Sequence, residues 1–323
     1  MSKTLLIKDK IKDFNKKIQV SGDKSLSIRW VLLASQATGK SKAYNLLMSE
    51  DVLAAIHSIK KLGIKVKIYK NYCEILGSGI NGFKYKKNLI IDAKNSGTFG
   101  RLILGLLIKS PEKVNLIGDK SLSKRDFSRI TVPLEKFGAK FYYKTKNKLP
   151  LTILGSPSAK GIKYLENKGS AQCKSSVMLA ALNASGTTSI KAKKSRNHSE
   201  LLFKYLKIPI KIKKTKKYDF IDIKKPKKIK PFNYQIPGDI SSSAFFMVLT
   251  TLAENSKLLI KNVNINPSRT GVITILKKMG AVILLKNQKN YRGEKISDIL
   301  IKSANNLKAI NCPPELNSSA IDE

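Results

Sequence analysis

Two kinds of hydrophobic pattern alternate along this chain. Residues 26–37 and 49–62 carry apolar positions at helical spacing, whereas residues 42–46 and 64–69 alternate apolar and polar side chains. The first pattern predicts helices and the second predicts strands. Gly63 follows the second helical stretch, as expected at a helix C-terminus. Strands that alternate with helices indicate an α/β fold.

The same order of elements recurs three more times. Each copy opens with a Gly- and Ser-containing turn before an apolar helix, and the steps between Gly22, Gly97, Gly169 and Gly238 are 75, 72 and 69 residues. Steps of this size are too long for a solenoid repeat and suit a subdomain of βαβαββ type. The sequence therefore predicts four copies of one unit.

Helix caps and strands within the copies are also predicted. Ser49 precedes an acidic first turn, and Asn197 is followed three residues later by Glu200, the spacing of a capping box. The stretch from Lys211 to Lys230 contains ten lysines interleaved with apolar residues. This alternation predicts edge strands with one solvated face.

The charge of the chain is strongly positive. Lys and Arg number 62 against 22 Asp and Glu, a formal net charge of +40, which would attract any polyanion. The excess is mostly lysine spread along the chain and comes with many Ile and Asn, as codon bias in an AT-rich genome would produce. A basic nucleic-acid-binding protein remains an alternative, although no aromatic stacking platform accompanies the lysines.

Cysteine and histidine content argues against disulfide or metal chemistry. Cys73, Cys173 and Cys312 are odd in number and far apart, which favours a reducing compartment. His57 and His198 are interpreted as ordinary surface or helix-face residues, and no metal is expected. The N-terminus lacks the pattern of a signal peptide, and no apolar run is long enough to span a membrane. A cytoplasmic location without membrane partners is expected.

The helix openings are candidate anion sites, because free backbone N–H groups and the positive end of a helix meet there. Lys24 and Arg29 flank Ser25 at the first opening, a set that can hold a phosphate. Arginine suits bidentate binding of oxyanions. Comparable side chains recur in the second and third copies, namely Arg101, Arg125, Arg129, Ser170, Gln172, Ser195 and Arg196.

These motifs resemble one enzyme family, the 5-enolpyruvylshikimate-3-phosphate synthases, or 3-phosphoshikimate 1-carboxyvinyltransferases. The resemblance runs in order from Gln19 to the end of the chain. It is carried by SGDKSLSIR, LLMSEDVLAAIHSIKKLGI, NSGTFGRLILGLL, GDKSLSKRDFSRITVPLEKFGA, GSAQCKSSVMLAAL, SRNHSELL, PGDISSSAFF, NINPSRTG and a final IDE.

The resemblance implies a fold of two domains, each an inside-out α/β barrel of repeated βαβαββ units. Residues 21–235 would form a complete domain of three units. Residues 1–20 and 236–323 would form an incomplete second domain with one of its three units. On this basis the chain is expected to be C-terminally incomplete and inactive as a free polypeptide.

The family's site residues are carried over only where the motifs match. Lys24 would contact both substrates, and Asp322 would accept the proton of the substrate 5-hydroxyl. Shikimate 3-phosphate would be bound by Lys24, Ser25, Arg29, Ser170, Ala171, Gln172, Ser195, Arg196 and Asp322. Phosphoenolpyruvate would be bound by Lys24, Gly97, Arg125 and Gln172.

The implied reaction transfers the enolpyruvyl group of phosphoenolpyruvate to the 5-hydroxyl of shikimate 3-phosphate and releases phosphate. The resemblance implies no cofactor and a monomer without a specific nucleic-acid partner. The chain departs from the family's usual residues at Ser21, Ile28, Phe99 and Gly100, and Phe99 could crowd the phosphoenolpyruvate side. A related transferase acting on UDP-N-acetylglucosamine is the alternative enzyme, but SGDKS differs from the opening of that family.

Overall fold

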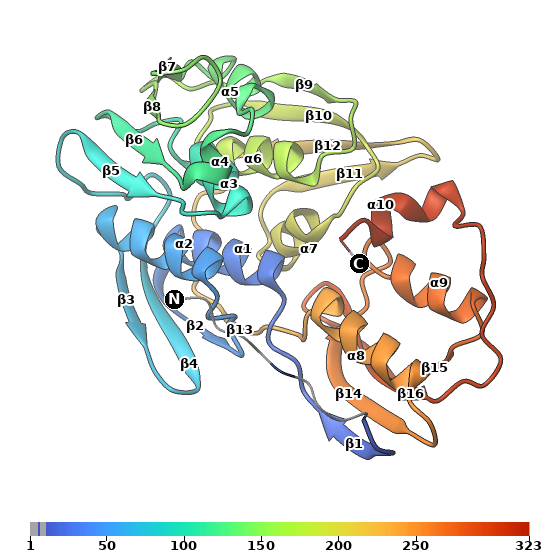
Figure 1. The fold of residues 1–323 in the computed structure, drawn as a ribbon. Coiled ribbons are helices and arrows are strands. Elements are labelled where there is room, and N and C mark those ends of the chain that lie inside the picture. Colours follow the sequence, from blue (N-terminus) through green and yellow to red (C-terminus); the bar gives the residue numbers. More distant parts are fainter. Residues whose placement is uncertain (1–5, 7–10, 323) are drawn as a thin grey trace. The chain divides into compact units, whose positions relative to one another are not determined.

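The computed structural model describes residue 6 and residues 11–322, and the chain divides into two compact units. Unit 1 comprises residues 1–20, 238–291 and 295–323, and unit 2 comprises residues 21–237 and 292–294. Figure 1 labels their elements. The N-terminal segment in which no signal peptide is expected lies mostly outside the described residues. None of the described helices has the length and apolarity needed to cross a membrane.

One sheet pattern occurs four times in the described part of the chain. A strand pairs in parallel with the strand that follows a helix, and an antiparallel strand pair completes each four-stranded sheet. In unit 2 the orders are β13-β2-β4-β3, β5-β6-β8-β7 and β9-β10-β12-β11. Their bounds are β2 Thr38–Tyr44, β3 Lys65–Ile68, β4 Tyr72–Ser78, β5 Leu89–Asp92, β6 Val114–Ile117, β7 Lys140–Tyr143, β8 Leu151–Leu154, β9 Lys163–Glu166, β10 Thr187–Lys193, β11 Ile210–Lys214, β12 Tyr218–Lys224 and β13 Asn233–Gln235.

Two strands pair with a sheet far away in the sequence. β1 (Asn15–Ile18) lies beside β14 (Lys257–Asn264), although it precedes the first helix of unit 2 in sequence. Conversely, β13 precedes the first helix of unit 1 but pairs with β2. The two units thus exchange their first strands, which explains why the chain passes from one unit to the other more than once.

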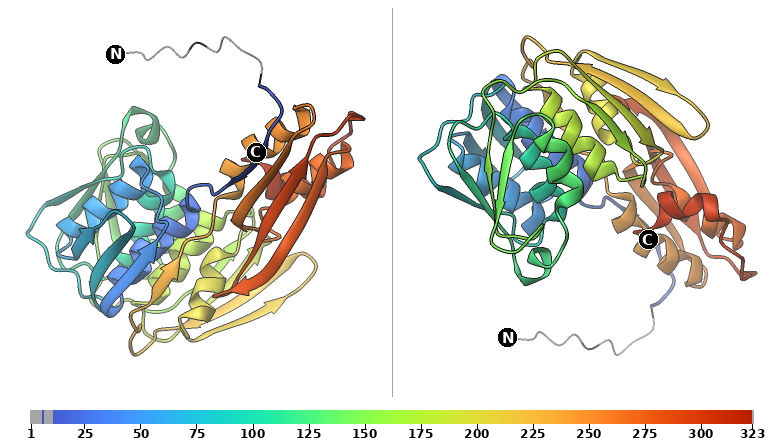
Figure 2. Two further views of the ribbon diagram at one scale, coloured as in Figure 1. Left: turned by 90° about the horizontal axis from the view of Figure 1, so that it is seen from below. Right: turned by 90° about the horizontal axis from the view of Figure 1, so that it is seen from above.

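The helices of unit 2 form its core. α1 (Lys24–Ser35), α3 (Gly97–Leu106) and α6 (Ala171–Ala181) are the first helices of three successive copies, and α3 packs on both others. Figure 2 shows the same elements from two further sides. These helices are buried along most of their length because almost every face is apolar or small. The other helices of unit 2 are α2 Glu50–Lys61, α4 Lys120–Ser123, α5 Ser128–Glu135 and α7 His198–Tyr205.

A close backbone approach sets the spacing of α3 and α6. A Cβ atom on Gly105 would lie 2.2 Å from the carbonyl oxygen of Ser176, so only glycine fits at this position without movement. The Ser176 hydroxyl also donates a hydrogen bond to the Arg101 carbonyl oxygen at 3.0 Å. Both contacts hold the two helices at a fixed distance.

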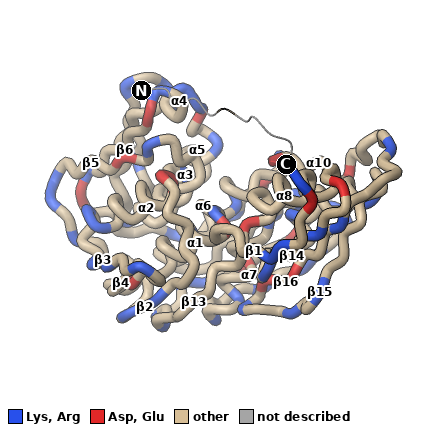
Figure 3. The backbone as a smooth tube through the Cα atoms, turned by 60° about the horizontal axis from the view of Figure 1, so that its bottom comes forward, with Lys and Arg blue, Asp and Glu red and all other residues tan. Residues whose placement is uncertain are grey.

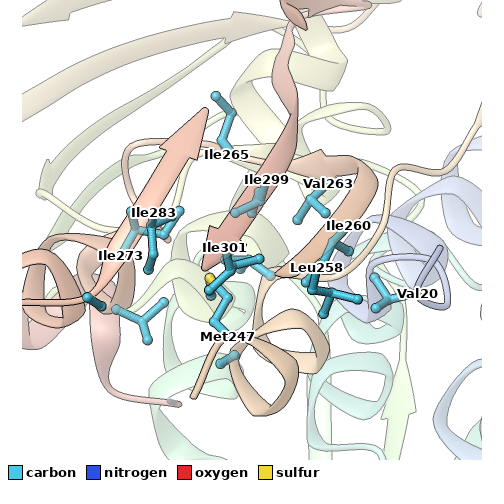
Figure 4. Close-up of a cluster of buried hydrophobic side chains, with 14 residues drawn as sticks. Val20, Met247, Leu258, Ile260, Val263, Ile265, Ile273, Ile283, Ile299 and Ile301 are labelled. Carbon is cyan, nitrogen blue, oxygen red and sulfur yellow. The ribbon is translucent and has the colours of Figure 1, made fainter. Parts of the chain in front are cut away.

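Unit 1 contains the fourth copy. Its elements are β1, α8 (Ile240–Leu252), β14, α9 (Gly271–Lys278), β15 (Val282–Tyr291), β16 (Glu294–Lys302), a 3-10 turn at Pro314–Leu316 and α10 (Asn317–Ala320). Buried side chains from α8, α9 and the sheet form one hydrophobic cluster, shown in Figure 4. The opposite face of α8 is apolar as well, with Phe245 81% and Leu252 66% exposed.

The predicted helices and repeated units are confirmed, whereas one strand prediction is wrong in part. The lysine-rich stretch was expected to form edge strands only. β11 is an edge strand, but β12 lies inside the sheet with neighbours on both sides. Its alternating burial leaves one face solvated as expected. The exposed face of β12 carries Phe220, Asp222 and a single lysine, Lys224, so the other lysines of the stretch lie on β11 or outside both strands. The inner position is compatible with the pattern because alternation reports the face, and not the neighbours, of a strand.

Two local predictions are corrected by the structure. Asn197 makes no side-chain cap hydrogen bond at the start of α7, and Glu200 turns inward to an ion pair with Lys174 instead of completing a capping box. His198 lies on a helix, as the first residue of α7, but not at the surface: it is buried, and its Nδ1 atom lies 2.7 Å from Glu294 Oε1. His57 is exposed, in agreement with the prediction.

The lysine excess is distributed over the molecule. Figure 3 shows Lys and Arg along most segments of both units, without a single continuous stripe. This distribution agrees with a general compositional bias better than with a concentrated polyanion-binding surface.

Candidate functional site

The openings of α3 and α6 carry matching serine caps. Ser96 Oγ accepts a hydrogen bond from the Phe99 N–H, and Ser170 Oγ accepts one from the Cys173 N–H, each at 3.3 Å. Gly169, just before the second cap, has φ of 71°, a conformation that favours glycine. At the opening of α3 the Gly97 N–H is already bonded to the Asn95 carbonyl oxygen at 2.9 Å, which limits the backbone donors available there.

Side chains from both openings bond one another. Arg101 donates through one terminal nitrogen to Gln172 Oε1 at 3.0 Å and to the Gly97 carbonyl oxygen at 3.1 Å. Gln172 Nε2 in turn donates to Thr98 Oγ1 at 3.1 Å. The structure therefore brings two predicted site residues, Gly97 and Gln172, into one hydrogen-bonded group.

A second guanidinium reaches the same place. A Cβ atom on Gly97 would lie 3.3 Å from an Arg125 terminal nitrogen and 2.7 Å from the corresponding Arg101 nitrogen. Burial lowers the pKa of Arg101, and the positive charge of Arg125 lowers it further. Two cations beside a helix N-terminus, brought close by the absence of a side chain at Gly97, favour an anion at this opening.

The opening of α1 has a different arrangement. Asp23 caps the helix, accepting from the Leu26 N–H at 2.8 Å. Lys24 is exposed and Ser25 is half-buried, so both can meet a ligand. Arg29 is 5% exposed and donates to the Ser25 carbonyl oxygen and to the hydroxyls of Ser175 and Ser199. Burial lowers the pKa of Arg29 to about 10, while nearby Glu200 favours the charged form.

The segment before α7 adds polar groups. Ser195 Oγ is buried and has no hydrogen-bond partner among the described residues. Arg196 follows it and is half-buried. Because an unsatisfied buried hydroxyl is costly, the Ser195 side chain is a candidate for a bond to a bound molecule.

Not every predicted residue joins this group. Ala171 begins α6 and can offer only backbone atoms and its methyl group. Asp322 belongs to unit 1, where it is exposed in the turn after α10. Phe99, which could have crowded an anion, is fully buried in the helical core, as is Ile28. Among the described residues, no three His, Cys, Asp or Glu side chains cluster as metal ligands would.

Sequence reasoning missed two features of the site. Arg101 was noted but not assigned a role, although its bond to Gln172 joins the two helix openings. The Lys174–Glu200 ion pair was not anticipated, because Glu200 was interpreted as part of a cap. The signal for Arg101 was its place one turn after Gly97, since residues four apart share a helix face.

The repeated βαβαββ units define an α/β protein whose cationic helix openings suit anionic ligands. A family model described as EPSP synthase (3-phosphoshikimate 1-carboxyvinyltransferase) matches residues 8–313. The 3-phosphoshikimate 1-carboxyvinyltransferase of Thermoanaerobacter sp. (strain X514) is 39% identical over 307 residues, which cover 95% of this chain and 71% of the relative. That of Bacillus subtilis (strain 168) is 35% identical over 318 residues, covering 98% and 73%.

A solved structure agrees with these sequence matches. EPSP synthase from Acinetobacter baumannii superposes with a TM-score of 0.86 at 36% identity, covering 96% of this chain and 69% of that one. The chain belongs to the EPSP synthase family. Its members are 3-phosphoshikimate 1-carboxyvinyltransferases, enzymes of the shikimate pathway that use phosphoenolpyruvate and shikimate 3-phosphate. The expected fold class, enzyme class and family are thus confirmed, and the UDP-sugar and nucleic-acid alternatives are not favoured.

Proposed function

We propose that the helix openings of unit 2 bind the two substrates of the family reaction. The observation that carries this proposal is the group formed by Gly97, Arg101, Arg125 and Gln172, in which two guanidiniums face a helix opening. Phosphoenolpyruvate carries a carboxylate and a phosphate. Both are oxyanions that arginine and backbone N–H groups bind well.

Phosphoenolpyruvate is assigned to Lys24, Gly97, Arg125 and Gln172. The missing side chain at Gly97 lets the Arg101 and Arg125 guanidiniums approach the helix opening closely. Gln172 is held by Arg101 and Thr98, so its orientation is fixed before a ligand arrives. Such preorganisation lowers the entropic cost of binding.

Shikimate 3-phosphate is assigned to the openings of α1 and α6 and to the segment before α7. Arg29 supplies a buried cation, and the unsatisfied Ser195 hydroxyl supplies a polar contact. The neutral groups suit the sugar-like hydroxyls of the substrate, and the cations suit its phosphate and carboxylate. The full set is Lys24, Ser25, Arg29, Ser170, Ala171, Gln172, Ser195, Arg196 and Asp322.

The reaction begins with protonation of the phosphoenolpyruvate methylene carbon, which makes the neighbouring carbon electrophilic. The 5-hydroxyl oxygen then bonds to that carbon and gives its proton to Asp322. Loss of a proton from the new methyl group and cleavage of the carbon–oxygen bond to phosphate yield the enolpyruvyl product and inorganic phosphate. Lys24 and Arg125 offset the charge on the oxyanions, and bound substrates are held in reacting geometry.

The two compact units are proposed to be the two domains of the family. Family membership also supports a cytoplasmic monomer whose partners are its two substrates. Size-exclusion chromatography with light scattering tests the monomer, since a stable dimer would double the mass.

Calorimetric titration of the chain with shikimate 3-phosphate, and then with phosphoenolpyruvate, tests the assignments. Arg125→Ala should weaken phosphoenolpyruvate binding by about tenfold or more, because a charged contact is lost. Lys136→Ala is the control: Lys136 is an exposed cation at the C-terminal end of α5 and should matter little. Salt-resistant DNA binding without affinity for shikimate 3-phosphate would contradict the proposal.

A further inference from the structure

A buried ion pair lies beside the proposed shikimate 3-phosphate residues. Lys174 Nζ of α6 is 2.6 Å from Glu200 Oε1 of α7, with both side chains at most 4% exposed. Burying two charges costs desolvation energy that their attraction often does no more than offset. A contribution to the stability of the fold therefore does not by itself explain why this ion pair is present.

The neighbours of the pair in sequence hold Arg29. Ser175 follows Lys174, and Ser199 precedes Glu200; both hydroxyls accept hydrogen bonds from the Arg29 guanidinium, at 3.1 and 2.9 Å. Ser199 Oγ also donates to Ser175 Oγ at 2.7 Å. The ion pair thus fixes the two chain segments that orient Arg29.

The charge of Arg29 also depends on Glu200. Glu200 is the carboxylate that most favours the charged form of Arg29, with smaller effects from Asp23 and Glu294 and an opposing effect from Arg196. One carboxylate therefore faces two buried cations, Arg29 and Lys174. This balance keeps Arg29 charged in a site from which most water is excluded.

Lys174 and Glu200 both lie in the first turn of their helices. Lys174 is the fourth residue of α6, one turn beyond the Ser170 cap and two residues after Gln172. Glu200 occupies the first turn of α7, shortly after Ser195 and Arg196. A contact between these first turns fixes the distance from one helix opening to the other.

We propose that Lys174 and Glu200 are positioning residues for shikimate 3-phosphate: they join the openings of α6 and α7 and hold Arg29 in place for the substrate. This inference rests on the proposed function, which assigns Arg29 and the α6 opening to that ligand. Neither Lys174 nor Glu200 touches the substrate.

The test is calorimetric titration of shikimate 3-phosphate and of phosphoenolpyruvate with charge variants, each first checked by its melting temperature. Glu200→Gln should weaken shikimate 3-phosphate binding by about tenfold or more and change phosphoenolpyruvate binding much less. The double variant Lys174→Met, Glu200→Leu removes both charges at similar volume and should keep a parent-like melting temperature.

The double variant separates positioning from a structural role. A structural pair predicts that removing both charges restores shikimate 3-phosphate affinity along with stability, whereas positioning predicts that the affinity stays at least about tenfold lower. Glu200→Asp, which keeps the charge on a shorter arm, should fold and bind with intermediate affinity. Glu74→Gln is the control, because Glu74 pairs with Lys40 and Lys42 on β2, away from these helix openings.

Three outcomes would overturn this inference and leave the proposed function standing. The double variant could bind shikimate 3-phosphate like the parent chain, or Glu200→Gln could weaken the binding of both ligands equally. A folded Glu200→Asp could also bind shikimate 3-phosphate like the parent chain. A parent chain that binds neither ligand would instead overturn the proposed function, and the inference with it.

Discussion

Arg101 and Gln172 join two helices through one hydrogen bond of 3.0 Å, from a guanidinium nitrogen to the amide oxygen. The same Arg101 nitrogen also donates to the Gly97 carbonyl oxygen. The orientation of Gln172 is therefore determined by a residue of α3 and not by its own helix. Because Arg101 is occupied in holding Gln172, Arg125 is the guanidinium left to contact the proposed ligand.

Gln172→Ala is expected to weaken phosphoenolpyruvate binding by about tenfold, since Arg101 loses a bond that holds it in place. The melting temperature should change little because Gln172 is only half-buried. Titration of both substrates measures the effect. Gln288→Ala in β15 is the matched control at an exposed position; equal effects of the two substitutions would contradict the role of Gln172.

Gly97→Ala is expected to impair phosphoenolpyruvate binding without loss of stability. The new methyl group would lie 2.7 Å from an Arg101 nitrogen and 3.3 Å from an Arg125 nitrogen, so both guanidiniums must move. Alanine also has a higher helix propensity than glycine, by up to about 1 kcal/mol in a helix interior and less at Gly97, the first residue of α3. The apparent affinity should fall while the melting temperature holds or rises.

The matched control for Gly97→Ala is Gly100→Ala in the same helix. Its new methyl group would meet only carbon atoms, the nearest of them Ala93 Cβ at 3.2 Å. It should leave phosphoenolpyruvate affinity unchanged. Loss of affinity in Gly100→Ala as well would show that helix packing, and not the guanidiniums, is responsible.

The three cysteines are expected to differ in reactivity. Burial raises the pKa of Cys73 to about 12 and also raises that of Cys173, so little thiolate forms at either. Cys312 is exposed. A maleimide or disulfide reagent at pH 8 should label one thiol rapidly in the folded chain and three after unfolding. Cys312→Ser should abolish the rapid phase; a rapid phase that persists would refute the assignment.

Asp298 is expected to stabilise unit 1 in a pH-dependent way. Burial alone would raise the pKa of its carboxyl group, but bonds from Lys261, the Asn262 N–H and Asn287 lower it overall. The pKa of Asp298 in the folded chain therefore lies below its value of about 3.9 in the unfolded chain. The carboxylate stabilises the fold fully at a pH above the unfolded pKa, and this stabilisation is lost as the pH falls through the folded pKa.

Asp298→Asn should therefore lower the free energy of unfolding at pH 7 by about 1–3 kcal/mol, and the difference should shrink below about pH 4. Urea denaturation at pH 7 and at pH 3 measures it. Asp13→Asn is the control at an exposed position. A destabilisation of Asp298→Asn that is as large at pH 3 as at pH 7 would exclude the carboxylate as its source.

The sequence predicts the repeated fold because its signals are local. Helical and alternating periods, together with Gly and Ser at each opening, reveal where α1, α3, α6 and α8 begin. The inner position of β12 was missed because the period of a strand carries no information about its neighbours. Likewise, the exchange of β1 and β13 is a long-range pairing that local patterns do not contain.

The sequence also predicts the local features of the candidate site but not its long-range contacts. Ser170 and Ser96 signal helix openings by residue type, and the structure shows both as caps. The partner of Glu200 was not predictable from its spacing to Asn197, since a buried lysine on another helix competes for the same carboxylate. His198 is buried for the same kind of reason: Glu294, far away in sequence, offers it a partner.

The contact of Gly105 with the Ser176 backbone has a consequence for how this protein tolerates sequence change. Gly105 lies eight residues after Gly97 in α3, about 12 Å along the helix axis, so it is remote from the site proposed at the helix opening. Even so, a side chain at residue 105 would push α6 outward and pull Gln172 away from Arg101. A position remote from the proposed site thus limits which variants of this enzyme evolution or protein engineering can retain.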